Sequence, residues 1–575
     1  MKNVKSIKTL DWIFIIFGIL LIILSLSITL VLTGRHTGFN LVQLIGVVIG
    51  LAFLTSGVSL KNAYIQIDLK QKNISLLNPQ KIFVLCLIGI YILTLIIASN
   101  NLFDSFLWYD ESGQFWIAKG LNHYSDPYQS PGGLKNVIEN NRFYNLDPGG
   151  FSVLLHFWSS VSNSYIWLRA LPYSFFIGTI IAFIYLTYQW TRKIYIALLV
   201  GFLPILSTTI IYYGFELRAF SMEYLGALMG IIALEALGTK ISTGRLFLWG
   251  MILSLFMTSR YSIIILIFFV SLYVIFLIWN ENVSVKSKTI FFFSYSTPVF
   301  LSLFMVYFLS LRLQNPNIQP LFYLPYLSEN WKILLSPGHL IYLIFLLFLL
   351  VLTIIDLRRQ STILHKYRPL LFVTLSSNIF VIMLSFWGKY PWTPFQRWGL
   401  PFYILVFLCL AVLMGELLTH LTHEPTNLEF ALLIIIIFLT LYIRKGNLTL
   451  SENKHPDLVC LENINFNNVQ NIYVDHWASP ELRYLFEYGD FQRLANGIYP
   501  ERFDFTKGTN HIILGGGISV GGSKEDWNKA QAKRVEINDY DLLIAPGISE
   551  YIFNERWTLL EGCSIESGVY IPIVP

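Results

Sequence analysis

The feature that most constrains this chain is a series of apolar runs of about 20 residues, separated by short polar segments. As a helix, a run of that length spans the roughly 30 Å hydrocarbon core of a bilayer. Composition points the same way, because 55% of the residues are hydrophobic and only 13% are charged. A soluble chain usually carries about twice that charged share. The sequence therefore predicts an all-α polytopic membrane protein.

Roughly 13 helices are expected to cross the membrane, at about 20 residues per crossing. The first apolar run is too long for a cleaved signal peptide, so we expect it to remain as a membrane helix. The expected spans are residues 12–32, 41–60, 82–99, 165–190, 194–213, 217–237, 246–257, 262–279, 290–311, 340–355, 370–387, 400–418 and 430–443.

Basic residues predict the orientation of these spans. Three lysines lie within residues 1–11 and four within residues 61–81, on either side of the first two spans. The positive-inside rule places both segments in the cytoplasm, and the external loop of residues 100–150 on the outer face. Arg444 and Lys445 break the rule by falling outside, which long exported domains tolerate.

The chain is expected to form two domains. Residues 1–445 make up the transmembrane domain, and residues 446–575 lack a spanning run and are expected to form a soluble, exported α/β domain. The protein would then be a multi-pass protein of a plasma membrane, such as a bacterial inner membrane. Strand-like runs in the second domain lie at 471–477, 511–514 and 541–545.

An adjacent acidic pair, Asp110 and Glu111, follows the third expected span. Charges beside a membrane are costly, so their positions carry information about function. Other charges of interest lie in the same outer loop or at outer helix ends, namely Arg142, Asp147, Arg169, Glu216, Arg218, Arg260, Lys389 and Arg397. With the acidic pair they are expected to line one outward-facing cavity. Taken singly, each also fits a paired or snorkelling residue at the membrane interface.

Such a combination suits the transfer of a sugar from a lipid phosphate. The leaving phosphate carries negative charge, which fixed arginines in a poorly hydrated cleft stabilise. The planar donor fork of arginine matches phosphate oxygens, and a facing carboxylate can orient and deprotonate an acceptor hydroxyl. The aromatic residues near the pair, among them Trp108 and Trp116, fit either sugar stacking or an ordinary aromatic belt at headgroup level.

The layout resembles the GT-C superfamily of polyprenyl-phosphate-sugar-dependent glycosyltransferases. Within it, the chain is most similar to the branch with protein O-mannosyltransferases and lipid A aminoarabinose transferases. WYDESGQFWIAKG (108–120) resembles the first external loop, and NLDPGGFSVLLHFWSSVSNSYIWLRALPYS (145–174) resembles the HPP-type segment. YYGFELRAFSMEYLGAL (212–228) resembles the E-x-R-x-Y/F helix entry, and TPFQRWGLPFYIL (393–405) the late R-(Y/W)-x-x-P segment.

The resemblance implies an inverting glycosyltransferase with a polyprenyl-phosphate-linked sugar as donor and a glycan, lipid or protein as acceptor. It implies that Asp110 is the catalytic base, Glu111 a supporting acid, and Arg218 and Arg397 contacts to phosphate or sugar. Enzymes of this branch generally need no catalytic metal, although the sequence itself excludes no divalent metal at Asp110 and Glu111. The HPP position reads Asp147-Pro148-Gly149, and this departure leaves the role of that loop open.

Two other functions stay open. A transporter or flippase of lipid-linked glycans needs ionisable residues midway through the membrane and broken helices paired between repeats. No internal repeat is evident in this sequence. A membrane scaffold that keeps a GT-C-like fold without catalysis is compatible with the altered segment at Asp147. The net charge of +5 is spread along the loops and gives no indication of nucleic acid, so membrane lipids are the expected partners.

Cys460 and Cys563 both lie in the C-terminal segment and can test its compartment. If the segment is exported, an oxidising environment permits a disulfide between them, with two free thiols as the alternative. If the bridge forms, alkylation of the denatured protein will label these two cysteines only after reduction. Equal labelling with and without reductant, in protein from an oxidising compartment, would rule the bridge out.

Overall fold

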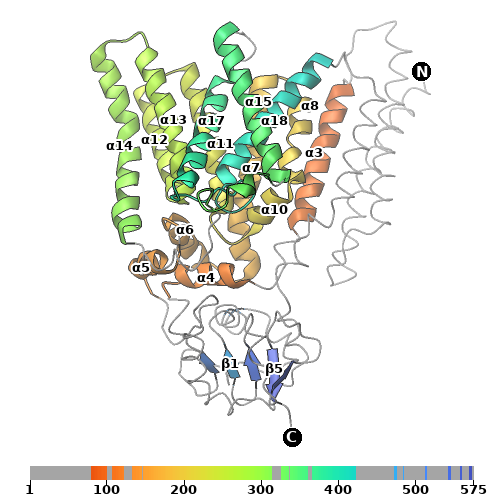
Figure 1. Ribbon diagram of the computed structural model, residues 1–575, viewed down its shortest axis with the longest axis vertical. Helices are drawn as coiled ribbons and strands as arrows, with labels where there is room; N and C mark the ends of the chain where they lie inside the picture. Colours follow the sequence, from red (N-terminus) through yellow and green to blue (C-terminus); the bar gives the residue numbers. More distant parts are fainter. Residues whose placement is uncertain are drawn as a thin grey trace, which may run out of the picture. The chain divides into compact units, whose positions relative to one another are not determined.

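The structure is a computed structural model of the chain (Figure 1). It comprises two compact units, residues 1–100 with 424–441 and residues 101–423 with 442–575. The described element of the first unit is α3 (Pro79–Ala98), and all other described elements belong to the second. The described residues are 79–99, 107–121, 132–145, 147–313, 326–335, 337–359, 366–421, 472–474, 484, 488, 512–514, 542–544, 557–559 and 569–572.

Six helices of the second unit are long and apolar enough to cross a membrane, counted over the described residues. They are α7 (Tyr165–Thr191), α11 (Phe220–Thr239), α13 (Tyr261–Asn280), α14 (Val285–Leu309), α15 (Pro337–Arg359) and α17 (Arg368–Phe386). Two further apolar helices are α12 (Thr243–Met257) and α18 (Leu400–Leu421). The predicted helical fold with several apolar helices of membrane-spanning length is thus confirmed, while the total of roughly 13 spans stays a prediction. The expected spans 12–32, 41–60 and 430–443 lie outside the described residues.

The single span expected at 194–213 is instead a series of short helices. α8 (Ile194–Val200) and α9 (Leu203–Leu206) are followed by α10 (Thr208–Phe215), and the chain bends by 75° between them. Pro204 lacks an N–H and cannot continue a preceding helix. Ser207 then starts the next helix, because its side chain accepts a hydrogen bond from the N–H of Ile210. Prolines also lie inside the unbroken helices α7 and α14, so Pro204 alone does not predict such a break.

α11 is the central helix of the bundle, and α14 and α15 lie at its periphery. It packs against α7, α13 and α18. In its apolar stretch 72% of the residues are buried, against 33% for α14 and 17% for α15. The exposed side chains of those two helices are large and apolar, for example Phe300, Phe304 and Ile341. Low burial places α14 and α15 at the periphery of the bundle. Their apolar side chains would be stable there in contact with lipid tails.

Three short helices lie together at one end of the bundle (Figure 1). They are α4 (Tyr109–Ala118), α5 (Leu134–Tyr144) and α6 (Gly150–Ser159). α4 and α6 bind each other's carboxyl ends. Lys119 Nζ donates to the carbonyl of Ser159 at 3.0 Å, and His156 Nδ1 lies 2.7 Å from the carbonyl of Ala118. These bonds satisfy carbonyls that have no partner within their own helix.

The C-terminal part contains a five-stranded sheet with the order β2-β1-β3-β5-β4. β1 (Ile472–Val474) is parallel to β2 (Ile512–Leu514) and to β3 (Leu542–Ile544), and these strands fall within the three strand-like runs of the sequence. β4 (Trp557–Leu559) and β5 (Val569–Pro572) add an antiparallel edge that the sequence did not indicate. Cys460 and Cys563 lie outside the described residues.

Gly250 permits the close approach of α12 and α14. A Cβ atom there would lie 2.7 Å from the carbonyl oxygen of Tyr295 and 2.7 Å from Cγ of Pro298. We expect Gly250→Ala to lower the free energy of unfolding by about 1–3 kcal/mol through overpacking. Gly244 lies on the same helix with nothing within 4 Å, so Gly244→Ala should be neutral or slightly stabilising. Thermal unfolding in detergent measures both, and equal midpoints would contradict this role of Gly250.

Candidate active site

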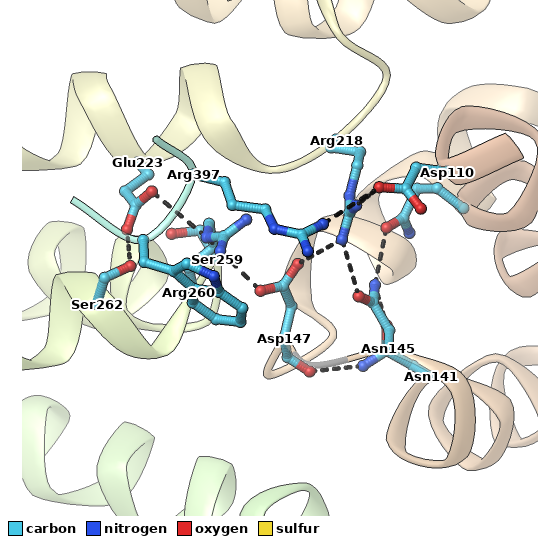
Figure 2. A network of polar contacts seen from close by, with 12 residues as sticks. Asp110, Asn141, Asn145, Asp147, Arg218, Glu223, Ser259, Arg260, Ser262 and Arg397 are labelled. Atoms are coloured by element: carbon cyan, nitrogen blue, oxygen red, sulfur yellow. Dashed lines mark hydrogen bonds and ion pairs between the residues drawn. The ribbon is translucent and has the colours of Figure 1, made fainter. Parts of the chain in front are cut away.

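Side chains of alternating charge form one continuous chain at the end of the bundle where α4, α5 and α6 lie (Figure 2). Its members come from five separate segments of the sequence. In spatial order this charged chain consists of Arg397, Asp110, Arg218, Asp147, Arg260 and Glu223.

Asp110 occupies the outer half of the charged chain. It lies in the first turn of α4, and its Oδ2 atom accepts from Nη1 of Arg218 at 2.5 Å and from Nη1 of Arg397 at 3.5 Å. No hydrogen bond from the described residues reaches its other oxygen, Oδ1. The side chain is 22% exposed, so this carboxylate is held through one oxygen and remains accessible.

Arg218 joins Asp110 to Asp147. It lies in the turn between α10 and α11, where its Nη2 atom is 3.9 Å from Asp147 and donates to the side-chain oxygen of Asn145 at 3.4 Å. Burial alone would lower the pKa of the guanidinium. The carboxylates of Asp110, Asp147 and Glu216 outweigh that effect and raise the pKa of Arg218. The residue is therefore a permanent cation between two acids.

Arg260 and Glu223 form the buried inner end. Nε of Arg260 lies 3.6 Å from Asp147 and 3.4 Å from Glu223, and the arginine side chain is 2% exposed. Its guanidinium also lies over the rings of Phe220, at 4.4 Å, and Trp398, at 5.4 Å. Glu223 accepts a hydrogen bond from Ser262. Sequence reasoning missed Glu223, although an ionisable residue within the expected span 217–237 is itself a signal of function.

Uncharged side chains hold the Asp147 loop in place. Asn141 of α5 donates to the carbonyl of Asp147 at 2.8 Å and accepts from Ser152 of α6 at 2.6 Å. Gln114 of α4 donates to Ser152 at 2.6 Å and accepts from Asn145 at 2.8 Å. Buried polar groups that satisfy one another in this way specify a single arrangement. The network therefore fixes α4, α5 and α6 around Asp147. The amides carry no charge, and the sequence search for charged groups did not consider them.

Gly149 allows this loop to enter α6. Its φ of 97° lies in the left-handed region, which favours glycine, and a Cβ atom there would meet Asn141 at 2.9 Å. The segment Asp147-Pro148-Gly149 therefore has a defined conformation and a charged contact on each side of Asp147.

Glu111 forms a separate buried pair with Arg169 of α7. Nη2 of Arg169 donates to Oε2 of Glu111 at 2.7 Å, and the N–H of Leu217 donates to Oε1 at 2.8 Å. The Arg169 side chain is 3% exposed and the Glu111 side chain is 0% exposed. Glu111 thus joins α4 to α7 and to the turn that carries Arg218. The role of supporting acid for Glu111 stays a prediction.

The remaining candidates differ in their placement. Glu216 is buried close enough to Arg218 to raise the pKa of that residue. Arg142 forms an ion pair of 3.8 Å with Glu139, one turn earlier on α5. Lys389 has an exposed side chain and forms no ion pair within the described part of the chain. The structure thus brings Asp110, Asp147, Arg218, Arg260 and Arg397 together, with Glu111 and Arg169 alongside.

The outer end of the charged chain is rich in positive charge. Burial and the neighbouring guanidinium of Arg218 both lower the pKa of Arg397. Two cations held close together favour an anion between them. Over the described residues, no group of three or more His, Cys, Asp or Glu side chains could hold a metal ion.

No protein-family model matches this chain, and comparison with curated proteins finds no match. The resemblance to the GT-C superfamily therefore stays a prediction that rests on the four sequence segments.

The Glu111–Arg169 pair should contribute strongly to stability. Arg169→Met leaves the Glu111 carboxylate buried without its cation, and we expect a loss of about 3–5 kcal/mol in the free energy of unfolding. Denaturant titration in detergent measures this loss. Adding Glu111→Gln should recover part of it, because the buried charge is then removed.

Lys135→Met provides the matched control. It breaks a 4.0 Å pair with Glu139 in which the side chains are 86% and 38% exposed. Exposed pairs contribute at most about 1 kcal/mol. Equal losses in Arg169→Met and Lys135→Met would contradict a structural role for the buried pair.

Proposed function

We propose that this protein is an inverting glycosyltransferase that moves a sugar from a polyprenyl-phosphate donor to an acceptor hydroxyl at the outer face of the membrane. The observation that carries the proposal is an accessible carboxylate, Asp110, next to several arginines at the ends of membrane helices. A base and a set of cations are the two chemical requirements of the reaction. The family resemblance of four separate segments supports the same assignment.

Asp110 is assigned the role of base. Arg218 holds its Oδ2 atom, so the carboxylate has a fixed direction, and Oδ1 accepts no hydrogen bond from the described residues. In the proposed reaction Oδ1 takes the proton of the acceptor hydroxyl while the hydroxyl oxygen attacks the anomeric carbon. The bond between that carbon and the phosphate oxygen breaks, and the phosphate leaves with the bonding electrons. Attack opposite the leaving group inverts the anomeric centre.

The arginines are assigned to the leaving phosphate. Arg397 has the most exposed side chain of the three in the charged chain, at 31%, against 11% for Arg218 and 2% for Arg260. Nη1 of Arg260 is buried and donates no hydrogen bond to the described residues. Arg397 and Arg218 are therefore the donors that a phosphate can reach, and Arg260 holds Asp147 from the buried side. Fixed donors of this kind stabilise developing negative charge without having to reorganise.

The proposal also includes how the chain crosses the membrane. It requires roughly 13 spans, a cytoplasmic N-terminus, and both the loop 100–150 and the C-terminal domain 446–575 on the outer face, as in a bacterial inner membrane. The proposed α/β domain is supported by the five-stranded mixed sheet, whose parallel strands need crossover connections.

Transport of a lipid-linked glycan is the main competing function, and the bend between α9 and α10 is the feature that favours it. However, Glu223 lies in the first turn of α11 rather than midway along it. The charged chain is therefore gathered at helix ends. A scaffold without catalysis is less favoured, because the altered Asp147 segment takes part in the charged chain instead of being lost from it.

Asp110→Asn tests the proposal directly. The amide cannot accept the proton, so we expect transfer from a polyprenyl-phosphate sugar to fall by at least about a hundredfold. Expression and membrane insertion should be unchanged, because Asp110 is partly exposed and the isosteric amide keeps its shape. Purified protein and lipid-linked donor are the materials for the assay.

Glu139→Gln is the control for the loss of a single negative charge nearby. Glu139 lies on α5 with a side chain that is 38% exposed, and the variant should transfer sugar at the rate of the unmodified protein. Near-normal activity in Asp110→Asn would refute the assignment of the base. Movement of the lipid-linked sugar across the bilayer without transfer would favour the transporter.

A further inference from the structure

A tyrosine from the C-terminal segment is fully buried against the helices of the candidate site. Tyr484 is 0% exposed, and its hydroxyl donates to the carbonyl of Asn163 at 2.8 Å. Asn163 lies in the turn that joins α6 to α7. A buried tyrosine usually needs such a hydrogen-bond partner for its hydroxyl. The contact therefore ties the C-terminal segment to the turn in front of the helix that carries Arg169.

Tyr484 and Tyr488 both contact Phe115 of α4. The ring centroids lie 5.1 Å and 5.6 Å from that of Phe115, in edge-to-face geometry, and Tyr488 also lies 6.0 Å from Trp116. The N–H of Tyr488 donates to the carbonyl of Tyr484 at 2.9 Å, so the tyrosines are one helical turn apart. Edge-to-face pairs add attraction beyond the burial of area.

These contacts act on the helix that carries the proposed base. α4 has ten residues, and Phe115 lies little more than one turn after Asp110. Polar bonds fix α4 to the bundle through Glu111 and Gln114. The aromatic pair Phe115 and Trp116 is covered by tyrosines of the C-terminal segment instead. Among the described residues, α4 is thus held by polar contacts from the helical part of the chain and by aromatic contacts from the C-terminal segment.

We propose that the Tyr484–Tyr488 segment is a positioning element, which fixes α4 and thereby the direction of the Asp110 carboxylate relative to Arg218 and Arg397. This inference rests on the function proposed above. The C-terminal region then acts on the transfer step itself, through α4, in addition to any contact that it makes with an acceptor. Tyr484 is a positioning residue and does not touch the reacting atoms.

The test compares Tyr484→Ala, Phe115→Ala and the double variant in the full-length protein. We expect kcat to fall by about tenfold in each single variant, because small displacements of a catalytic group are costly. KM for the lipid-linked donor should change by less than about twofold, since the arginines are untouched. The double variant should lose clearly less than the product of the two single losses, because both single variants remove the contact between Tyr484 and Phe115.

Tyr484→Phe and Tyr307→Ala complete the set. The phenylalanine keeps the ring contacts and loses only the hydrogen bond to Asn163, so it should lose only about threefold in kcat. It also serves as the test variant if Tyr484→Ala does not fold. Tyr307 lies on α14 with 47% of its surface exposed, and its replacement should leave kcat unchanged.

Amide hydrogen exchange over residues 109–118 gives a readout that does not depend on turnover. We expect faster exchange in Tyr484→Ala than in Tyr307→Ala, because α4 loses one set of its contacts. Unchanged exchange, normal kcat in Tyr484→Ala, or losses that multiply in the double variant would each overturn the inference. An unmodified protein that folds but transfers no sugar would instead refute the proposed function, while the exchange measurement would still decide whether Tyr484 holds α4.

Discussion

The position of Arg218 between Asp110 and Asp147 is the interaction on which the rest of the site depends. A buried guanidinium is stable only when opposite charges and hydrogen-bond acceptors surround it. Arg218 obtains them from α4 and from the loop before α6, and the structure therefore holds these two segments against the turn between α10 and α11. Asp147 also balances the positive charge of Arg260, with which it forms a second ion pair. None of these helix ends can move independently without leaving a charge unpaired.

The two ends of the charged chain differ in exposure, and this difference suggests a division of labour. Arg260 and Glu223 are 2% and 0% exposed, whereas Asp110 and Arg397 are 22% and 31% exposed. Charges that are closed off from solvent fix a geometry, and only the accessible ones can meet a substrate. The inner pair therefore supports the outer pair in the proposed reaction. Figure 2 shows Asp147 between Arg260 and Arg218.

The sequence predicted which charged residues lie at helix ends better than it predicted how these residues pair. Apolar runs fix the ends of helices, so Asp110, Arg218 and Arg397 could be placed at helix ends. The run length gives no information on which ends meet, because that depends on packing between helices far apart in the sequence. Lys389 illustrates the limit: it lies eight residues before Arg397 in the same loop, yet its side chain is exposed.

Two kinds of feature were missed for physical reasons. The bend near Pro204 lies within an apolar run, whose composition is compatible with a straight span. Asn141 and Gln114 carry no charge, and amides are common in loops, so their spacing gave no signal. Their role depends on a network that exists only once α4, α5 and α6 are packed. The Asp147 segment was an open question in the sequence because its place between two arginines is likewise a tertiary property.

The two arginines that contact Asp110 hold it unequally, and the proposed chemistry uses this difference. The bond from Arg397 to Asp110 is 3.5 Å long, against 2.5 Å for Arg218, and Arg397 is the more exposed of the two. A donor phosphate would therefore draw Arg397 away more easily than Arg218. Asp110 would then keep its direction through Arg218 while the phosphate takes up the guanidinium of Arg397. In this scheme a bound donor places the leaving group next to a base that is already oriented.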